Sequence, residues 1–295
     1  GQPVCGRAGS SWNVAEPFFP KERLIILGGG HVALPVAEFG ARVGFLVTVV
    51  DDRLSFANPG RFPMAEKVIC DDFGHAIEEL KIQESDYICI VTRGHRHDAD
   101  CLRMIGKGKE PAYLGMIGSR RRVGIVKQEL LEEGYAPERM SRLKSPIGLK
   151  IGGVTPEEIA ISILAEIIQV KRMDREDKRV KNRSDLDFDV LKRLAEEPDE
   201  PKAVVTVIES KGSSPRGAGA KMIVYRDGRI LGSIGGGCSE AAVLGEARSL
   251  IGSGRYKVVH VDLTGEAAED EGMVCGGIMD VLVEDFATDR EPCDR

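Results

Sequence analysis

The chain has 295 residues, 42% of them hydrophobic and 30% charged, with a formal net charge of -6 at pH 7. This length is sufficient for two domains with cores of their own, and the composition is that of a globular protein. The negative charge argues against a nucleic-acid partner, and the lack of an apolar run of about 18 residues argues against a membrane span. Seven cysteines at irregular spacing, with no signal peptide at the start, favour a cytoplasmic protein over a disulfide framework.

The first domain is expected over residues 21–173, where short apolar runs alternate with helical patterns. Apolar runs rich in β-branched residues and separated by helices are typical of a parallel sheet that is buried on both faces. The predicted strands are residues 24–27, 45–50, 87–91 and 112–117. The predicted helices are residues 32–43, 119–133 and 156–170, the last with Thr155 as its N-cap and Pro156 at its first position.

A charged join is expected over residues 174–200. Residues 171–183 carry seven positive and three negative side chains and few apolar ones, which predicts an exposed linker or a fraying helix end. A basic docking site is the alternative interpretation. Ser184 is the expected N-cap of a short amphipathic helix that ends at about Glu197.

A smaller domain is expected over residues 201–287, followed by a tail at residues 288–295. Its predicted elements are strands at residues 203–208, 220–225, 230–234, 257–261 and 278–286, a turn at residues 226–229, and a helix from Cys238 to Leu250. The predicted fold class is therefore α/β, with a Rossmann-like parallel-sheet domain followed by a smaller α/β domain that bears cysteines.

Gly28, Gly30 and Ala33 form a G-x-G-x-x-A pattern between a predicted strand and a predicted helix, with His31 inside it. In that context the pattern predicts a turn that binds the phosphates of a nucleotide at the start of the helix. The alternative is a Rossmann-type turn kept for packing, which holds no dinucleotide or holds another phosphorylated ligand.

Asp51 and Asp52 end the next predicted strand, about twenty residues after the glycines. An acidic side chain at this place can accept hydrogen bonds from a ribose 2′-hydroxyl, which favours NAD over NADP. The candidate cofactor-binding residues of the first domain therefore include both aspartates beside Gly28, Gly30, His31 and Ala33.

Two later segments follow strands of the same predicted sheet. His95, His97 and Asp98 could bind a metal or transfer protons, but their close spacing in a loop defines no coordination geometry, so a metal role is not favoured. Ser119 and Arg120 open a predicted helix, and a helix N-terminus with guanidinium groups suits a phosphate. A capped helix with a solvated basic first turn is the alternative.

Cys238 is the residue most suggestive of chemistry. It directly follows three glycines, including Gly236 and Gly237, at the start of a predicted helix. Helix N-termini stabilise thiolates and bind anions, and glycines let a ligand approach the main chain. Cys275 lies in a second glycine-rich loop, so the pair suggests a sulfur, metal or anionic-cofactor site. The alternative is that both are small buried residues beside tight turns.

Together these segments resemble the XdhC/CoxI family, accessory proteins for the maturation of xanthine dehydrogenase and related molybdenum hydroxylases. The resemblance covers roughly residues 17–287 and rests on several ordered segments. They are residues 28–33, 50–53, 56–58, 94–98, 115–121 and 155–160 in the first domain, and residues 209–222, 235–240 and 272–277 in the second.

The resemblance implies that the protein binds molybdenum cofactor, supports its sulfuration and delivers it to a hydroxylase apoenzyme, with a cysteine desulfurase as a further partner. Cys238 would contact the molybdenum or its sulfur, with Cys275 as the second candidate for this chemistry. Ser213, Ser214 and Arg216 would hold the phosphate or the pterin. A tight β-turn that exposes hydroxyls is the alternative for these last three residues.

The domain order departs from the family. The cysteine domain commonly comes first, whereas here the Rossmann domain leads. Val4-Cys5-Gly6 echoes Val274-Cys275-Gly276, so we hypothesise that residues 1–20 are the remnant of an upstream copy of the cysteine domain.

Two other functions are open from the sequence. One is an NAD-dependent oxidoreductase with His95 or His97 as proton donor, and the other is a non-catalytic scaffold for the hydroxylase. Whether the protein turns over a substrate is therefore left open. A homodimer is expected, because a single cysteine domain leaves hairpin edges that need cover.

Overall fold

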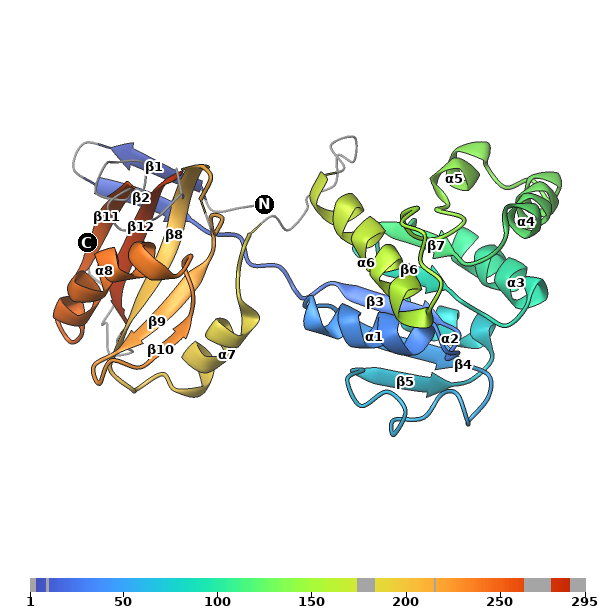
Figure 1. Ribbon diagram of the computed structural model, residues 1–295, viewed down its shortest axis with the longest axis horizontal. Coiled ribbons are helices and arrows are strands. Elements are labelled where there is room, and N and C mark those ends of the chain that lie inside the picture. The colour runs from blue at the N-terminus through green and yellow to red at the C-terminus, as the bar shows by residue number, and fades with distance from the viewer. Residues whose placement is uncertain (1–3, 9–10, 174–183, 215, 263–276, 287–295) are drawn as a thin grey trace. The chain divides into compact units, whose positions relative to one another are not determined.

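The computed structural model describes residues 4–8, 11–173, 184–214, 216–262 and 277–286 (Figure 1). The chain divides into two compact units. Pro20–Arg179 form the first, called here the parallel-sheet unit, and Gly1–Phe19 with Val180–Arg295 form the second, called here the antiparallel-sheet unit. Each unit has its own five-stranded sheet and its own hydrophobic core.

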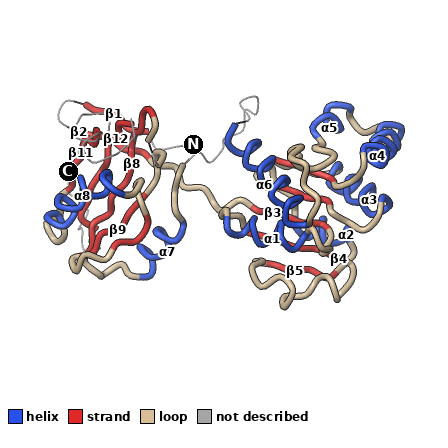
Figure 2. The backbone as a smooth tube through the Cα atoms, in the orientation of Figure 1, coloured by secondary structure: helices blue, strands red, loops and turns tan. Residues whose placement is uncertain are grey.

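The parallel-sheet unit has the strand order β5-β4-β3-β6-β7. Helices lie on both faces of this sheet (Figures 1 and 2), which confirms the predicted Rossmann-like fold. Its strands are β3 (Arg23–Leu27), β4 (Leu46–Asp51), β5 (Lys67–Cys70), β6 (Tyr87–Ile90) and β7 (Tyr113–Met116). Its helices are α1 (Ala33–Arg42), α2 (Phe73–Leu80), α3 (His95–Gly106), α4 (Arg120–Glu132), α5 (Pro137–Arg142) and α6 (Pro156–Met173).

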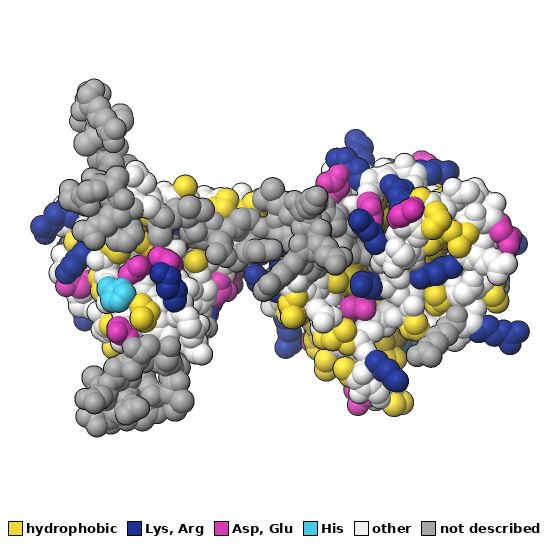
Figure 3. All heavy atoms as spheres, turned by 90° about the horizontal axis from the view of Figure 1, so that it is seen from above, with side chains coloured by type: hydrophobic (Ala, Val, Ile, Leu, Met, Phe, Trp, Pro, Cys, Tyr) yellow, Lys and Arg dark blue, Asp and Glu magenta, His cyan; other side chains and the backbone are white. Residues whose placement is uncertain are grey.

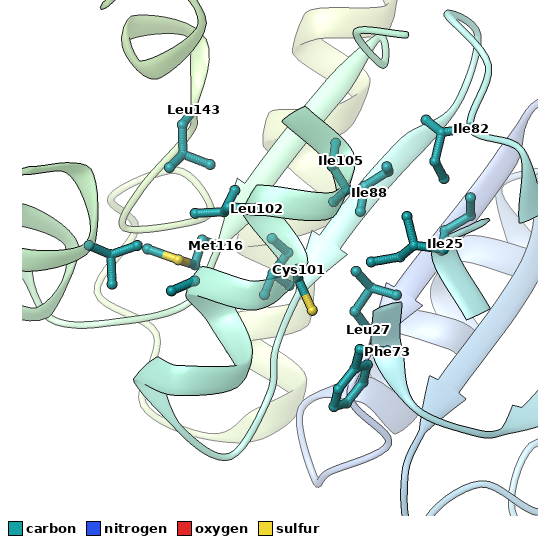
Figure 4. Packing of buried hydrophobic residues seen from close by; sticks show 14 of the residues in the cluster. Ile25, Leu27, Phe73, Ile82, Ile88, Cys101, Leu102, Ile105, Met116 and Leu143 are labelled. Atoms are coloured by element: carbon teal, nitrogen blue, oxygen red, sulfur yellow. The ribbon is translucent and has the colours of Figure 1, made fainter. Parts of the chain in front are cut away.

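Strand β3 shows why both faces are covered. Leu24 and Ile26 belong to the core formed with α1 and α6, whereas Ile25 and Leu27 belong to the core formed with α2, α3 and α4 (Figure 4). All four side chains are fully buried. Because side chains alternate along a strand, a central strand between two helical layers is apolar at every position.

The strand order changes direction at β3. The chain passes from β3 through α1 to β4 on one side, while β6 pairs with the other side of β3. In open α/β sheets, ligands bind in the crevice outside the carboxyl ends of the strands at such a switch point. The segments that follow β3 and β6 therefore border the candidate ligand crevice.

The sequence patterns do not predict β5, α2, α3 or α5. The expectation of a loop over the histidines is wrong, because His95 to Asp98 form the first turn of α3, with Gly94 as the N-cap. The first turn of this helix is polar, and its large buried side chains, such as Leu102 and Ile105, come later. The apolar periodicity therefore starts too late in the sequence to reveal where the helix begins.

The antiparallel-sheet unit has the strand order β10-β9-β8-β12-β11. Helix α8 covers one face and packs Val243 near Val205 and Val281, whereas α7 packs Val190 near Ile223 on the other face. The strands are β8 (Lys202–Gly212), β9 (Lys221–Tyr225), β10 (Ile230–Gly232), β11 (Tyr256–Asp262) and β12 (Gly277–Phe286), and the helices are α7 (Phe188–Glu196) and α8 (Gly237–Leu250).

A hairpin of β1 (Val4–Ala8) and β2 (Ser11–Ala15) belongs to the same unit, where β1 contacts β8. Beyond the hairpin, the carboxylate of Glu16 lies 2.7 Å from Nζ of the buried Lys221. The same Nζ donates to Oγ1 of Thr206 at 3.0 Å. This buried ion pair fixes residues near the start of the chain to β9, while the origin of residues 1–20 as a domain remnant stays a hypothesis.

The predicted start of α7 at Ser184 is wrong. Asp187 is the N-cap, and its side chain accepts a hydrogen bond from the backbone N–H of Asp189 at 2.9 Å. Ser184 instead is buried against Gly219, where its hydroxyl occupies the position that a Cβ would take. The sequence around Ser184 does not distinguish an N-cap serine from a serine packed on a glycine, because the contact with Gly219 is a tertiary one.

The surface in view in Figure 3 shows basic and acidic side chains interspersed on both units. None of the helices in the described ranges combines the length and the hydropathy that crossing a bilayer requires.

Replacing a core residue of β3 tests the two-layer packing. We expect Ile26→Ala to lower the free energy of unfolding by about 2–5 kcal/mol, because it leaves a cavity at a fully buried site. The control is Ile161→Ala on α6, where the side chain is 52% exposed and the expected change is within about 0.5 kcal/mol. Urea unfolding followed by circular dichroism measures both, and equal losses would contradict the assignment.

Candidate functional site

The glycine turn after β3 lies at the carboxyl edge of the sheet, where the ligand crevice is expected. Gly28 has φ = +111°, and a Cβ there would lie 2.5 Å from the carbonyl oxygen of Val91, the residue after β6. Gly30 has open space on the side where a Cβ would project, and Ala33 is fully buried at the start of α1. His31 is exposed beside this turn. The main chain at Gly30 is therefore accessible to a ligand. At position 28 a glycine is required, because the backbone after β6 lies too close for a Cβ atom.

Asp51 is buried at the end of β4 and holds the glycine turn. Its carboxylate accepts the backbone N–H of Gly29 at 2.8 Å and that of Arg53 at 3.0 Å. The guanidinium of Arg53 donates two more hydrogen bonds to it, at 2.9 and 3.0 Å. Burial acts to raise the pKa of Asp51, but these hydrogen bonds outweigh it and lower the pKa below its usual value. Asp51 is therefore an ionised group with several bound donors.

Asp52 forms a bidentate ion pair with Arg93, with N–O distances of 2.9 and 2.8 Å. Asp52 follows β4 and Arg93 follows β6, and β3 lies between these two strands. The ion pair therefore connects the segments on either side of the glycine turn.

A second buried carboxylate lies at the same edge of the sheet. Asp98 accepts hydrogen bonds from Thr92 and Arg122, and burial raises its pKa despite both contacts. Ser119 is the N-cap of α4, in line with the alternative of a capped helix, and accepts the backbone N–H of Arg122 at 3.3 Å. Arg120 is the first residue of α4, and its side chain lies outside the described part of the structure.

The described side chains of the histidine segment contact other groups of the same unit. The ring of His97 packs against that of Phe73, with centroids 5.6 Å apart, and Asp98 is buried beneath Arg122. The side chain of His95 is outside the described residues. Across the described part of the chain, no group of three or more His, Cys, Asp or Glu side chains is placed to hold a metal ion.

In the antiparallel-sheet unit, three loops lie toward the same end of the sheet. Strands β8 and β10 run in the same direction, because both are antiparallel to β9, so the loops that follow them leave toward that end, although β10 ends level with Val205 and β8 continues to Gly212. Strand β12 begins at that same end, since Gly277 pairs with Gly212. A Cβ on Gly277 would lie 2.7 Å from the backbone nitrogen of Ser214. The start of β12 therefore packs directly on the loop that follows β8 and carries Ser213 and Ser214, called here the serine loop. Cys275 lies outside the described residues.

The loop before α8 requires its three glycines. Gly235, Gly236 and Gly237 have φ values of +136°, +72° and +52°, in the region that disfavours other residues. Oε1 of Glu240 accepts the N–H of Gly236 at 2.9 Å and the hydroxyl of Ser233 at 2.6 Å. Glu240 therefore fixes the loop from the first turn of the helix.

Cys238 is the second residue of α8, with Gly236 as the N-cap. Its side chain is outside the described residues, but its main-chain position is at the helix start that the sequence predicts. The first N–H groups of a helix have no intrahelical acceptor, so they attract negative charge.

The serine loop is held by a residue that the sequence patterns do not identify. Asp185 accepts hydrogen bonds from Nε of Arg216 at 2.6 Å and from the backbone of Gly217 at 3.0 Å. Ser214 donates its hydroxyl proton to the carbonyl of Arg216 at 2.8 Å, and Ser213 is exposed. The guanidinium proposed for phosphate binding is therefore already paired.

The sequence patterns identify neither Asp185 nor Glu240. Asp185 is distant from Arg216 in the sequence, and no pattern links the two residues. Glu240 could have been found, because it follows Gly236 by four residues, a spacing at which an acid in the first helical turn can reach back to free N–H groups.

Residues 24–167 match the family model described as the XdhC Rossmann domain, and residues 195–262 match the model described as the XdhC and CoxI family. The chain belongs to the XdhC and CoxI family. Both halves of the predicted resemblance are thereby confirmed, with the Rossmann match in the parallel-sheet unit and the other match in the antiparallel-sheet unit.

Three relatives share parts of this XdhC and CoxI family chain. It is 38% identical to the uncharacterized protein YqeB of Escherichia coli over 168 residues, which cover 57% of this chain and 30% of YqeB. It is 34% identical over 153 residues to a probable xanthine dehydrogenase subunit of Bacillus subtilis, and the match covers 52% of this chain and 44% of that protein. It is 40% identical over 74 residues to the molybdenum cofactor insertion chaperone PaoD of Escherichia coli, and the match covers 25% of this chain and 23% of PaoD. The chain thus spans less than half the length of each relative.

Among solved structures, a protein described as a xanthine dehydrogenase from Bacillus halodurans is similar at 33% sequence identity. The similarity has a TM-score of 0.49 and covers 57% of this chain and 47% of the other.

Two glycines of the family fingerprint should respond differently to alanine. We expect Gly28→Ala to destabilise the parallel-sheet unit by about 1–3 kcal/mol or more, because it combines a left-handed φ with a clash against β6. Gly30→Ala should change stability by less than about 0.5 kcal/mol, because its Cβ enters open space. Thermal unfolding of both variants provides the measurement, and comparable losses would refute this account of the turn.

Removing the acid that holds the second glycine loop should loosen that loop. We expect Glu240→Ala to cost about 1–3 kcal/mol locally, because Gly236 loses its acceptor. Hydrogen exchange over residues 233–240 should speed up accordingly. Glu246→Ala is the matched control on the same helix, since it removes only an exposed pair with Lys257. Unchanged exchange in Glu240→Ala would show that the glycines hold their conformation without this contact.

Proposed function

We propose that this chain is an accessory protein of a molybdenum hydroxylase of the xanthine dehydrogenase type, which binds molybdenum cofactor and supports its sulfuration and insertion into the apoenzyme. The observation that carries the proposal is the main-chain position of Cys238, second in α8 and directly after three glycines with positive φ. This segment lies within the residues that match the XdhC and CoxI model. The names of two relatives, a molybdenum cofactor insertion chaperone and a probable xanthine dehydrogenase subunit, support it.

The chemistry of this cargo suits the loops that carry Cys238 and the two serines. The cofactor carries a phosphate or nucleotide and a sulfur-bound metal, so its carrier needs main-chain donors for anions and a soft ligand for the metal or its sulfur. A helix N-terminus supplies the first and also lowers the pKa of a cysteine thiol placed there. Cys238 is the proposed contact to the metal or its sulfur, and Cys275 is the second.

The serine loop is the proposed place for the phosphate or the pterin. Ser213 offers an exposed hydroxyl, and Gly236 and Gly237 leave open space where their Cβ atoms would project. Arg216 can take part only in competition with Asp185, whose carboxylate is about as exposed as the guanidinium, at 35% against 29%. Asp185 therefore lowers the affinity of Arg216 for an anion, because the anion has to displace this carboxylate from the guanidinium.

The remaining parts of the proposal concern partners. Any turnover is confined to sulfur transfer, with a cysteine desulfurase as the source of sulfur and a hydroxylase apoenzyme as the recipient. A homodimer is proposed because β10 and β11 are edge strands of the described sheet, and exposed edges favour pairing with another chain.

Anaerobic binding of molybdenum cofactor to the purified chain tests the proposal. We expect the parent to retain molybdenum and the cofactor's absorption through gel filtration, and Cys238→Ala to lose at least about tenfold in affinity, which is about 1.4 kcal/mol. Cys70→Ala is the control, because Cys70 is an exposed cysteine in the parallel-sheet unit.

Three outcomes are informative. Loss in Cys238→Ala alone would support a cofactor-handling role for this loop. Equal binding by the parent and Cys238→Ala would remove Cys238 from the site, and no binding by the parent would refute the proposal.

A further inference from the structure

A dinucleotide would need two features at the carboxyl edge of the parallel sheet, one for its pyrophosphate and one for its ribose. In a Rossmann domain, the pyrophosphate lies against the second glycine of the fingerprint, and a carboxylate at the end of the next strand accepts hydrogen bonds from the ribose. The first requirement fits, because the main chain at Gly30 is open. The second falls on Asp51 and Asp52, which end and follow β4.

Neither carboxylate is available in the form that a ribose needs. Asp51 is 1% exposed, and its two oxygens already accept the N–H of Gly29 and three donors from Arg53. Both oxygens of Asp52 are held by Arg93. A ribose would have to displace guanidinium groups whose paired hydrogen bonds to the carboxylates carry charge on both partners, whereas a hydroxyl donor is neutral.

The segment after β4 also covers the glycine turn. A Cβ on Gly29 would overlap with the carbonyl oxygen of Phe56, so the backbone of this segment lies directly on the turn. Arg61 donates to the carbonyls of Gly29 and Gly30, at 3.2 and 3.4 Å. The turn is therefore packed against residues of its own chain on the side of β4.

The aromatic ring of this segment lies against two guanidinium groups. The guanidinium carbon of Arg53 lies 3.7 Å from the centroid of the Phe56 ring, and that of Arg61 lies 5.6 Å from it. A guanidinium beside the ribose carboxylate is the group that accommodates the 2′-phosphate of NADP. Here Arg53 is committed both to Asp51 and to the ring.

We infer that residues 51–61 fill the nucleoside half of the crevice with the protein's own groups, so that this domain rejects NAD and NADP although it carries their fingerprint. Asp51, Arg53 and Phe56 are the specificity-determining residues. The inference does not depend on the proposed handling of molybdenum cofactor, because it concerns the other unit. It removes the dinucleotide-dependent oxidoreductase as a function of this crevice.

Calorimetric titration of the full chain with NAD, NADP and AMP is the first test. AMP is included because it probes the nucleoside half without the rest of the dinucleotide. We expect no saturable binding of any of the three with a dissociation constant below about 1 mM. Saturable binding of any one of them with a dissociation constant below about 1 mM would overturn the inference.

A gain of binding is the second test. Arg53→Ala/Phe56→Ala frees oxygens of Asp51 and removes the ring, so we expect its affinity for NAD and AMP to rise at least tenfold above that of the parent. Arg53→Ala alone, which keeps Phe56 in place, serves if the double variant does not fold, as judged by circular dichroism, and should show a smaller rise. Arg42→Ala, which removes an exposed pair with Glu38 on α1, is the control and should not gain.

The gain has to be specific to residues 53 and 56. If the folded double variant binds no better than the parent, these residues do not cause the exclusion and the inference is wrong. If Arg42→Ala gains as much, the rise reflects the loss of a positive charge rather than the opening of the crevice.

Discussion

Asp51 connects three parts of the parallel-sheet unit. Its carboxylate ends β4, accepts the N–H of Gly29 in the turn after β3, and holds Arg53 at the start of the segment that covers this turn. A buried backbone N–H without a partner is costly, so the turn depends on this acceptor. Arg53 also lies against the ring of Phe56, and Arg61 donates to the carbonyls of Gly29 and Gly30, so the segment after β4 packs over the turn. The conformation of the crevice therefore depends on one ionised side chain.

The antiparallel-sheet unit uses a related interaction at its own glycine loop. Glu240 accepts the N–H of Gly236, as Asp51 accepts that of Gly29. The two loops differ in what stands next to them. The first is covered by the protein's own ring and guanidinium groups, whereas Gly236 and Gly237 face open space and precede Cys238. This difference supports placing the cofactor-handling site in the antiparallel-sheet unit.

Membership of the XdhC and CoxI family fits this division between the units. A fold and a fingerprint do not by themselves define a function, because the same turn can be kept for packing. In this chain the first glycine serves packing against β6, and the open face at Gly30 is what remains for a ligand. The proposed cofactor role therefore rests on the cysteine loop and on the family, not on the Rossmann pattern.

The sequence by itself determined the parallel sheet, the helix α4, the start of α6 capped by Thr155, the helix that begins near Cys238 and the family, because these depend on local periodicity and on short motifs. It did not reveal that the segment from His95 is helical, that Asp187 rather than Ser184 caps α7, or that Arg216 is paired with Asp185. It also could not show that the backbone of Phe56 packs on Gly29 or that Arg53 is paired with Asp51. These features depend on contacts between residues distant in the chain or on which neighbour a polar group selects, and only the tertiary structure decides them.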